Sequence, residues 1–372
     1  TNGTPIHAMS PLCKLLWLRE NEPKLFKKAA RFVGIKADVF FKLAGEYLVD
    51  YSIASATGLF NIEKFAWDEY TLNYLGLAAD RFSEPVSPYH MVNLPEDNSL
   101  GLPAGTPLVL GASDGCLANL GSGAIVPGTM AVTIGTSGAV RISSPKPFAD
   151  EEMRTFCYIL DKETYVIGGA TNNGAVVFEW LKDHFFDEIS YDDLFKDAAD
   201  ISLGCDGLLC LPYLLGERAP LWNSEVRGGF VGLSTRHTPM HFVRAVMEGT
   251  LLNLFSIGKV LLETQKVKAI YANGGFAKSK VWVQMLADIF GINVNLNDTV
   301  ETGSVGAALM GLKAIGHIEK YEDAGQFTQI GHIFKPNAAN RKKYAELFGE
   351  FETWAGIFNK KAKEGSTSSA KM

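Results

Sequence analysis

The stretch that decides the fold class runs from Val267 to Gly316 and reads VKAIYANGGFAKSKVWVQMLADIFGINVNLNDTVETGSVGAALMGLKAIG. Short apolar runs at 267–271 and 293–296 predict strands, and a segment with helical spacing follows each of them. Ser279 stands where a cap of the first helix is expected, and Gly291 stands where that helix should end. This strand-helix-strand-helix order predicts an α/β domain.

Toward the amino terminus the chain contains elements of the same kinds. Thr238-Pro239 has the cap and first-turn proline that start a helix, which we expect to reach Thr264. Pro23 should divide a helical region at 11–32 into two helices. The segment 85–107 is rich in Pro and Gly and is expected to be a loop. Further strands are predicted at 108–111, 130–134, 140–142, 165–167 and 208–211, and further helices after Asp114 and near 174–186.

Length and composition indicate an ordinary globular enzyme. A chain of 372 residues with 47% apolar and 20% charged residues predicts two domains. The net charge of −6 argues against nucleic acid as the main partner. The five cysteines include no CxxC pair, so the sequence indicates neither a zinc site nor a disulfide framework, and free thiols favour the cytoplasm. No uncharged apolar stretch is long enough to suggest a membrane partner.

The first candidate site is Gly111-Ala112-Ser113-Asp114-Gly115, at the end of a predicted strand. In open α/β sheets ligands bind beyond the carboxyl ends of strands. A carboxylate between small residues can approach a ligand closely and accept a proton from a hydroxyl that attacks phosphorus. The alternative is a turn aspartate that binds its own backbone.

Two glycine-bearing loops are candidates for nucleotide contacts. Gly135-Thr136-Ser137-Gly138 could present backbone N–H groups and hydroxyls to phosphate oxygens, or be a plain hairpin turn. Asn273-Gly274-Gly275, which leads to Ser279, could let a flat ligand lie against the backbone, or be a tight strand-to-helix connection. Neither the dinucleotide fingerprint G-x-G-x-x-G nor the Walker A pattern accompanies these loops.

The order of these segments resembles that of the FGGY carbohydrate kinases. The resemblance is carried by a spaced pattern whose fixed positions are all filled: Gly228-Gly229-Phe230-Val231-Gly232-Leu233, seven residues, His241-Phe242, two residues, and Ala245-Val246-Met247-Glu248. This pattern is similar to the second signature of the family. The resemblance extends from about Thr4 to Gly316.

The resemblance implies an α/β, two-domain, actin-like or ribonuclease-H-like ATPase fold with a central cleft. Residues 1–123 would be the remainder of the first, sugar-binding domain, and residues 124–372 the second, nucleotide-binding domain. The family's amino-terminal Asp-x-Gly-Thr phosphate loop has no counterpart in this sequence. We therefore expect the first domain to be incomplete and this chain alone to be inactive.

The resemblance also implies the roles of individual residues. Asp114 would be the catalytic base that accepts the proton of the sugar hydroxyl, and it would also bind substrate. The cofactors would be ATP and Mg²⁺, and no residue of this chain is assigned to the metal. The residues expected to contact the nucleotide are Gly135, Thr136, Ser137, Gly174, Gly274, Gly275 and Ser279.

The segment from Gly3 to Leu12 resembles most closely the gluconate kinase branch, although Ala8 replaces a usual proline. His7 and Met9 would then bind a sugar or sugar acid. His7 could instead make structural hydrogen bonds, and Met9 could belong to the core. The implied reaction is phosphorylation of the terminal hydroxyl of D-gluconate.

Three other interpretations stay open for the sequence. The chain could be a kinase for xylulose or another polyol, an actin- or chaperone-like ATPase without a sugar substrate, or an inactive paralogue. The sequence is also compatible with a homodimer.

Overall fold

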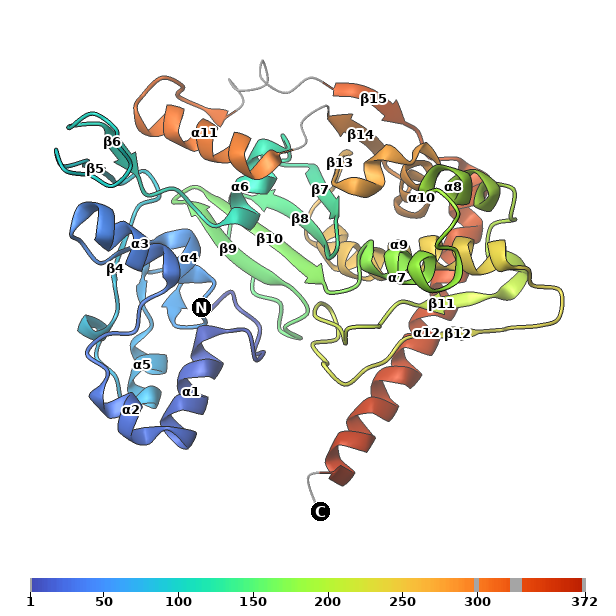
Figure 1. Ribbon diagram of the computed structural model, residues 1–372, viewed down its shortest axis with the longest axis horizontal. Helices are drawn as coiled ribbons and strands as arrows, with labels where there is room; N and C mark the ends of the chain where they lie inside the picture. Colours follow the sequence, from blue (N-terminus) through green and yellow to red (C-terminus); the bar gives the residue numbers. More distant parts are fainter. Residues whose placement is uncertain (1, 298–300, 322–329, 370–372) are drawn as a thin grey trace. The chain divides into compact units, whose positions relative to one another are not determined.

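The computed structural model describes residues 2–297, 301–321 and 330–369 and divides the chain into two compact units (Figure 1). The first unit comprises Thr1–Val126, Ser143–Ile167 and Glu301–Thr328, and the second comprises Pro127–Ile142, Gly168–Val300 and Gln329–Met372. These units are discontinuous along the chain, unlike the ranges 1–123 and 124–372 expected for the domains, which stay a prediction.

The first unit contains short helices and short paired strands. Its helices are α1 (Pro11–Asn21), α2 (Pro23–Lys28), α3 (Ile35–Ala44), α4 (Tyr51–Ser55), α5 (Glu69–Leu75), η1 (Ala79–Arg81), α6 (Asp114–Gly121) and α11 (Thr302–Ala314). Its strands are β1 (Leu48–Asp50), β2 (Phe60–Asn61), β3 (Ala66–Trp67), β4 (Glu84–Val86), β5 (Met91–Asn93), β6 (Pro107–Val109) and β9 (Phe156–Asp161). Strands β1 and β4 pair in parallel, whereas β2 with β3 and β5 with β6 pair antiparallel. The expectation of a loop over 85–107 is therefore wrong in part, because β4 and β5 occupy some of it.

The second unit contains longer elements. Its helices are α7 (Val176–Phe185), α8 (Tyr191–Ala199), η2 (Cys205–Gly207), α9 (Pro239–Thr264), η3 (Gly275–Lys278), α10 (Lys280–Phe290) and α12 (Ala338–Ser369). Its strands are β7 (Thr129–Ile134), β8 (Gly138–Ser144), β10 (Thr164–Thr171), β11 (Leu209–Leu211), β12 (Gly229–Val231), β13 (Ala269–Asn273), β14 (Asn293–Asn297) and β15 (Ile330–Phe334). The division between the units passes through β8 and β10.

The main sheet has the strand order β15-β14-β13-β7-β8-β10-β9. Strand β13 runs parallel to both β7 and β14, and Asn273 lies opposite Thr133. The loops that follow β7 and β13 therefore leave the same edge of the sheet, at the carboxyl ends of parallel strands. These are the two glycine-bearing loops that the sequence singled out.

Helix α9 forms the apolar centre of the second unit. It is the one helix of the described residues that is long and apolar enough to cross a membrane, and 78% of its apolar window is buried inside the protein. Such burial is typical of a core helix. Phe178 and Trp282 are also core residues, each 2% exposed.

Candidate active site

Asp114 lies in the first turn of α6, with its side chain exposed. Ser113 caps this helix, because its Oγ accepts a hydrogen bond from the backbone N–H of Cys116 at 3.4 Å. Ser52 fixes the cap through a 2.8 Å bond between the two hydroxyl oxygens. Asp114 Oδ1 accepts the N–H of the next residue, Gly115, at 2.7 Å. Oδ2 has no hydrogen-bond partner in the described part of the chain and is available to a ligand hydroxyl.

A buried ion pair supports the segment just before Asp114. Lys36 Nζ lies 2.6 Å from Asp50 Oδ2 and donates to the carbonyl of Ala112 at 3.1 Å. The side chain of Asp50 is fully buried, and its other oxygen caps α4 by accepting the N–H of Ile53 at 2.9 Å. Burial raises the pKa of Asp50 above its ordinary value, and Lys36 lowers it in part. The pair links α3, α4 and the backbone next to Asp114.

Helix α4 also holds the segment that contains His7 and Met9. Thr4 Oγ1 donates to the carbonyl of Ser55 at 2.8 Å, and Ser10 Oγ donates to that of Thr57 at 3.1 Å. The backbone N–H of Met9 donates to Nδ1 of His7 at 3.2 Å. The alternative expectation of a core Met9 is wrong, because this side chain is 57% exposed. His7 combines a local structural bond with partial exposure, so both interpretations of this residue remain compatible with its surroundings.

The loop between β7 and β8 is a tight hairpin, and Gly174 packs directly against its backbone. Gly174 and Ala175 donate their N–H groups to the carbonyls of Thr136 and Gly135 at 3.2 and 2.7 Å. A Cβ on Gly174 would lie 2.5 Å from the carbonyl oxygen of Gly135 and from the carbonyl carbon of Ser137. The structure therefore brings together four of the predicted nucleotide residues: Gly135, Thr136, Ser137 and Gly174.

The loop after β13 approaches the same hairpin from the neighbouring strand. Gly274 has φ of 99°, and a Cβ there would lie 2.3 Å from the carbonyl oxygen of Ile134. Gly275 faces open space. Ser279 accepts the N–H of Trp282 at 3.3 Å and is 6% exposed, so its hydroxyl serves as the cap of α10. Of the three predicted residues in this segment, Gly275 thus has the most open surroundings for a ligand, whereas Gly274 packs against the backbone of Ile134.

Sequence reasoning missed two residues of these sites. Lys36 gave no local signal, because its partner Asp50 is 14 positions away along the chain and depends on the fold. Asn273 could have been recognised as an amide at the carboxyl end of a strand. Its Oδ1 is buried and has no hydrogen-bond partner among the described residues, while its amide donates to Tyr271.

The second unit has features that fit ATP. Gly275 is open, and Asn273 Oδ1 is a buried acceptor that receives no donor from the described residues. A protein-held Mg²⁺ site has no such support. No group of three or more His, Cys, Asp or Glu side chains lies together in the part of the chain that the structure describes.

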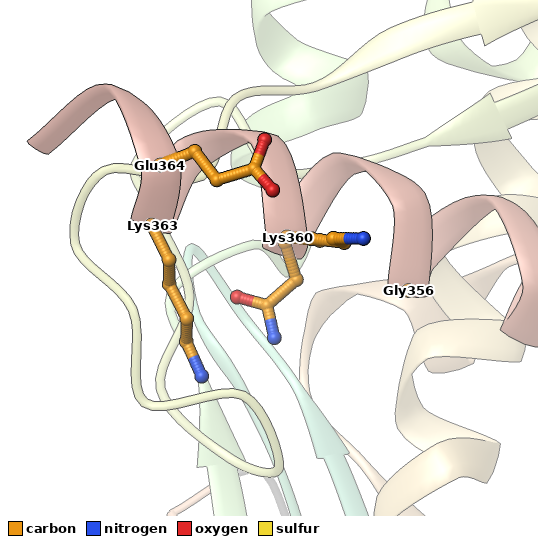
Figure 2. A pocket seen from close by; sticks show the side chains of 5 residues that line it. Gly356, Lys360, Lys363 and Glu364 are labelled. Atoms are coloured by element: carbon orange, nitrogen blue, oxygen red, sulfur yellow. The ribbon is translucent and has the colours of Figure 1, made fainter. Parts of the chain in front are cut away.

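Two surface hollows are lined by none of the predicted site residues. One of about 490 Å³ follows the end of α12 and is bordered by Gly356, Asn359, Lys360, Lys363 and Glu364 (Figure 2). The other, about 600 Å³, belongs to the first unit and is mostly apolar, with Lys14 and Arg31 on its wall. The assignment of the site to the strand-end loops stays a prediction.

Comparisons with known proteins match both units of the chain to one family. The profile described as "FGGY family of carbohydrate kinases, N-terminal domain" matches residues 1–121, and that of the C-terminal domain matches residues 130–315. A gluconokinase of Bacillus licheniformis is 43% identical over 364 residues, which cover 94% of this chain and 71% of the relative. A xylulose kinase of Bacillus subtilis is 33% identical, with coverage of 91% and 69%.

Solved structures show the same likeness. The crystal structure of gluconate kinase from Lactobacillus acidophilus superimposes with a TM-score of 0.92 at 34% identity. The superposition covers 96% of this chain and 74% of that one. The predicted α/β architecture is thereby confirmed.

Proposed function

Because the chain belongs to the FGGY family of carbohydrate kinases, we propose that the full-length gene product transfers the γ-phosphoryl group of ATP to D-gluconate, giving 6-phosphogluconate. The gluconokinase of Bacillus licheniformis supports gluconate, since its 43% identity exceeds the 33% of the xylulose kinase. Xylulose is the second candidate substrate, because that relative also covers most of the chain.

One observation carries the proposed chemistry, namely the exposed carboxylate of Asp114 on a fixed helix start. Asp114 accepts the proton of the terminal hydroxyl of the sugar acid as that oxygen attacks phosphorus. Ser113 and Ser52 hold the backbone, so the carboxylate does not have to be ordered when substrate arrives. His7 and Met9 bind the sugar acid.

The second unit holds the nucleotide. The hairpin Gly135–Ser137 binds phosphate oxygens through the backbone N–H groups of Thr136 and Ser137. The N–H of Gly135 donates to the carbonyl of Ser137 at 2.9 Å and so shapes the loop, which Gly174 closes from behind. Gly274, Gly275 and Ser279 contact the rest of the nucleotide. Mg²⁺ carried in with ATP would supply charge neutralisation at the phosphates, and no residue of this chain is proposed to hold it. We place the protein in the cytoplasm and propose a homodimer.

The test is release of ADP by the full-length product with gluconate, xylulose, glycerol or no sugar. We expect release that depends on gluconate, and Asp114→Asn should lower kcat by about 10²- to 10⁴-fold, the usual contribution of a general base. Asp192→Asn is the matched control, because Asp192 is also an exposed first-turn carboxylate of a serine-capped helix. Release without sugar, or with xylulose alone, would contradict the choice of substrate. Full turnover by the folded Asp114→Asn variant would contradict the choice of base.

A further inference from the structure

Glu217 is a buried carboxylate that joins three segments of the second unit. It is 3% exposed and accepts five hydrogen bonds. The donors are Thr171 Oγ1 at 2.6 Å, Asn172 N at 3.1 Å, Asn173 Nδ2 at 3.1 Å, Arg218 N at 2.6 Å and Asn253 Nδ2 at 2.7 Å. These donors belong to the end of β10, to the loop of Glu217 itself and to α9.

The donors compensate a charge that has no cationic partner. Glu217 takes part in no ion pair within the described ranges, and burial raises its pKa. A carboxylate offers about four acceptor positions, so five donors occupy them fully. Glutamine could not replace it without cost, because its amide group would face N–H donors instead of accepting from them. The site is therefore built for a carboxylate.

The segment that Glu217 holds, residues 171–175, is also the one that closes the hairpin Gly135–Ser137. Thr171 Oγ1 also accepts the N–H of Asn173 at 2.9 Å, which fixes the turn before Gly174. The next two N–H groups donate to the carbonyls of Thr136 and Gly135. A continuous chain of hydrogen bonds thus runs from Glu217 through residues 171–175 to the hairpin.

A second set of contacts ties the loop of Glu217 to the same strand end. The N–H of Ala219 donates to the carbonyl of Ala170 at 3.1 Å, and the guanidinium of Arg218 donates to that of Thr171 at 2.8 Å. Asn173 Nδ2 also donates to the carbonyl of Gly216 at 2.7 Å. These contacts place the backbone of the Glu217 loop next to the end of β10, so its carboxylate is held within reach of residues 171–173.

We infer that Glu217 is a positioning residue that presses residues 171–175 against the hairpin Gly135–Ser137 and so sets the affinity for nucleotide. The inference rests on the proposed nucleotide site. Hydrogen bonds of this kind fix the loop before the ligand binds, which lowers the entropic cost of ordering it on binding.

The test compares two buried carboxylates of the same unit in the full-length protein. Glu248 is 2% exposed and accepts from Arg244 Nε at 2.9 Å and from the hydroxyl of Tyr344 at 3.1 Å, and no predicted nucleotide residue contacts it. Glu217→Gln and Glu248→Gln should both lower stability in urea. Only Glu217→Gln should weaken binding of a fluorescent ADP analogue, by about tenfold or more, and raise the KM for ATP more than it lowers kcat.

A milder variant keeps the test decisive if Glu217→Gln does not fold. Thr171→Val is nearly isosteric and removes one donor to Glu217 together with the acceptor for Asn173. It should weaken ADP binding in the same direction. Wild-type affinity in a folded Glu217→Gln or Thr171→Val variant would overturn the inference, and so would equal weakening in Glu248→Gln. Wild-type protein that binds no ADP would instead overturn the proposed nucleotide site, and the inference with it.

Discussion

Asp50 has no exposed side-chain surface and lies 2.6 Å from the ammonium group of Lys36. Because burial raises its pKa, its contribution to stability is fully present below the unfolded value of about 3.9 and is lost as the pH rises through the folded value. Lys36→Met removes the cation that lowers this pKa. The free energy of unfolding of the variant should therefore fall more steeply with rising pH than that of the wild-type protein. We expect Lys36→Met to lower the free energy of unfolding by about 3 kcal/mol at pH 8 and by less at pH 5. This value is at the low end for a buried ion pair, because Lys36 is 31% exposed.

Urea unfolding at the two pH values measures this difference. Asp50→Asn supplies the control, because an amide oxygen can still cap α4 while carrying no charge. In the Asp50→Asn background, Lys36→Met should cost little and the cost should not depend on pH. Equal destabilisation at pH 5 and pH 8 in the wild-type background would show that Asp50 is not the titrating partner.

At the scale of single residues, the sequence was informative wherever a signal is local. Ser279 and Gly291 were predicted to begin and end a helix, and the structure places them as the N-cap and the left-handed C-cap of α10. The nucleotide contact also predicted for Ser279 stays a prediction. Lys36 could not be found in this way, because its importance comes from Asp50 and the carbonyl of Ala112, partners that only the fold supplies.

At the scale of elements, Gly174 decides how closely the segment between β10 and α7 approaches the hairpin Gly135–Ser137. A methyl group at Gly174 would lie 2.5 Å from two backbone atoms of the hairpin, which cannot yield as a flexible side chain could. Gly174→Ala should therefore displace the hairpin, cost about 1–3 kcal/mol of stability and weaken ADP binding. Isothermal titration with ADP and urea unfolding check the two effects.

Gly349 in α12 provides a matched substitution in the same unit. No atom lies within 4 Å of a Cβ added there, and the residue is helical. Gly349→Ala should raise stability by up to about 1 kcal/mol and leave ADP affinity unchanged. If Gly174→Ala binds ADP as tightly as Gly349→Ala does, the hairpin is not a nucleotide contact.

The elements that the sequence predicted are those with strong caps or isolated apolar runs. The proline break at Pro23 and the helix from Pro239 to Thr264 are confirmed. Elements such as α3, α8 and β9 escaped prediction, although α8 buries Leu194 and Ala198 at helical spacing and β9 is a nearly continuous buried run. The packing of α6 on α11 could not be predicted either, because it depends on Gly121 and Gly306. A Cβ on either glycine would lie 1.9 Å from a backbone oxygen of the other helix.

At the scale of the whole molecule, the order of weak signals was more informative than any one of them. Each glycine loop alone had an equally plausible structural explanation. Their sequence, together with the spaced pattern from Gly228 to Glu248, indicated the family that both profiles confirm. The discontinuous units could not be predicted, because Ser143–Ile167 and Glu301–Thr328 join the first unit only through contacts made in the fold.

The proposed sites divide between the two units, and this division can be measured. Asp114, His7 and Met9 belong to the first unit, whereas Gly135 and Gly274 belong to the second. A ligand that binds only the native state slows the exchange of amides that open at its site, by up to about 100-fold at 100 times its Kd. ADP should therefore protect amides at 134–138, 171–176 and 272–280, and gluconate should protect those at 3–12 and 111–116.

Hydrogen exchange of the full-length protein followed by mass spectrometry resolves these peptides. Xylulose offered at the same concentration is the control for a sugar without a carboxylate. Protection by gluconate confined to the second unit would move the sugar site away from Asp114, and the choice of catalytic base would then be wrong even if the enzyme phosphorylates gluconate.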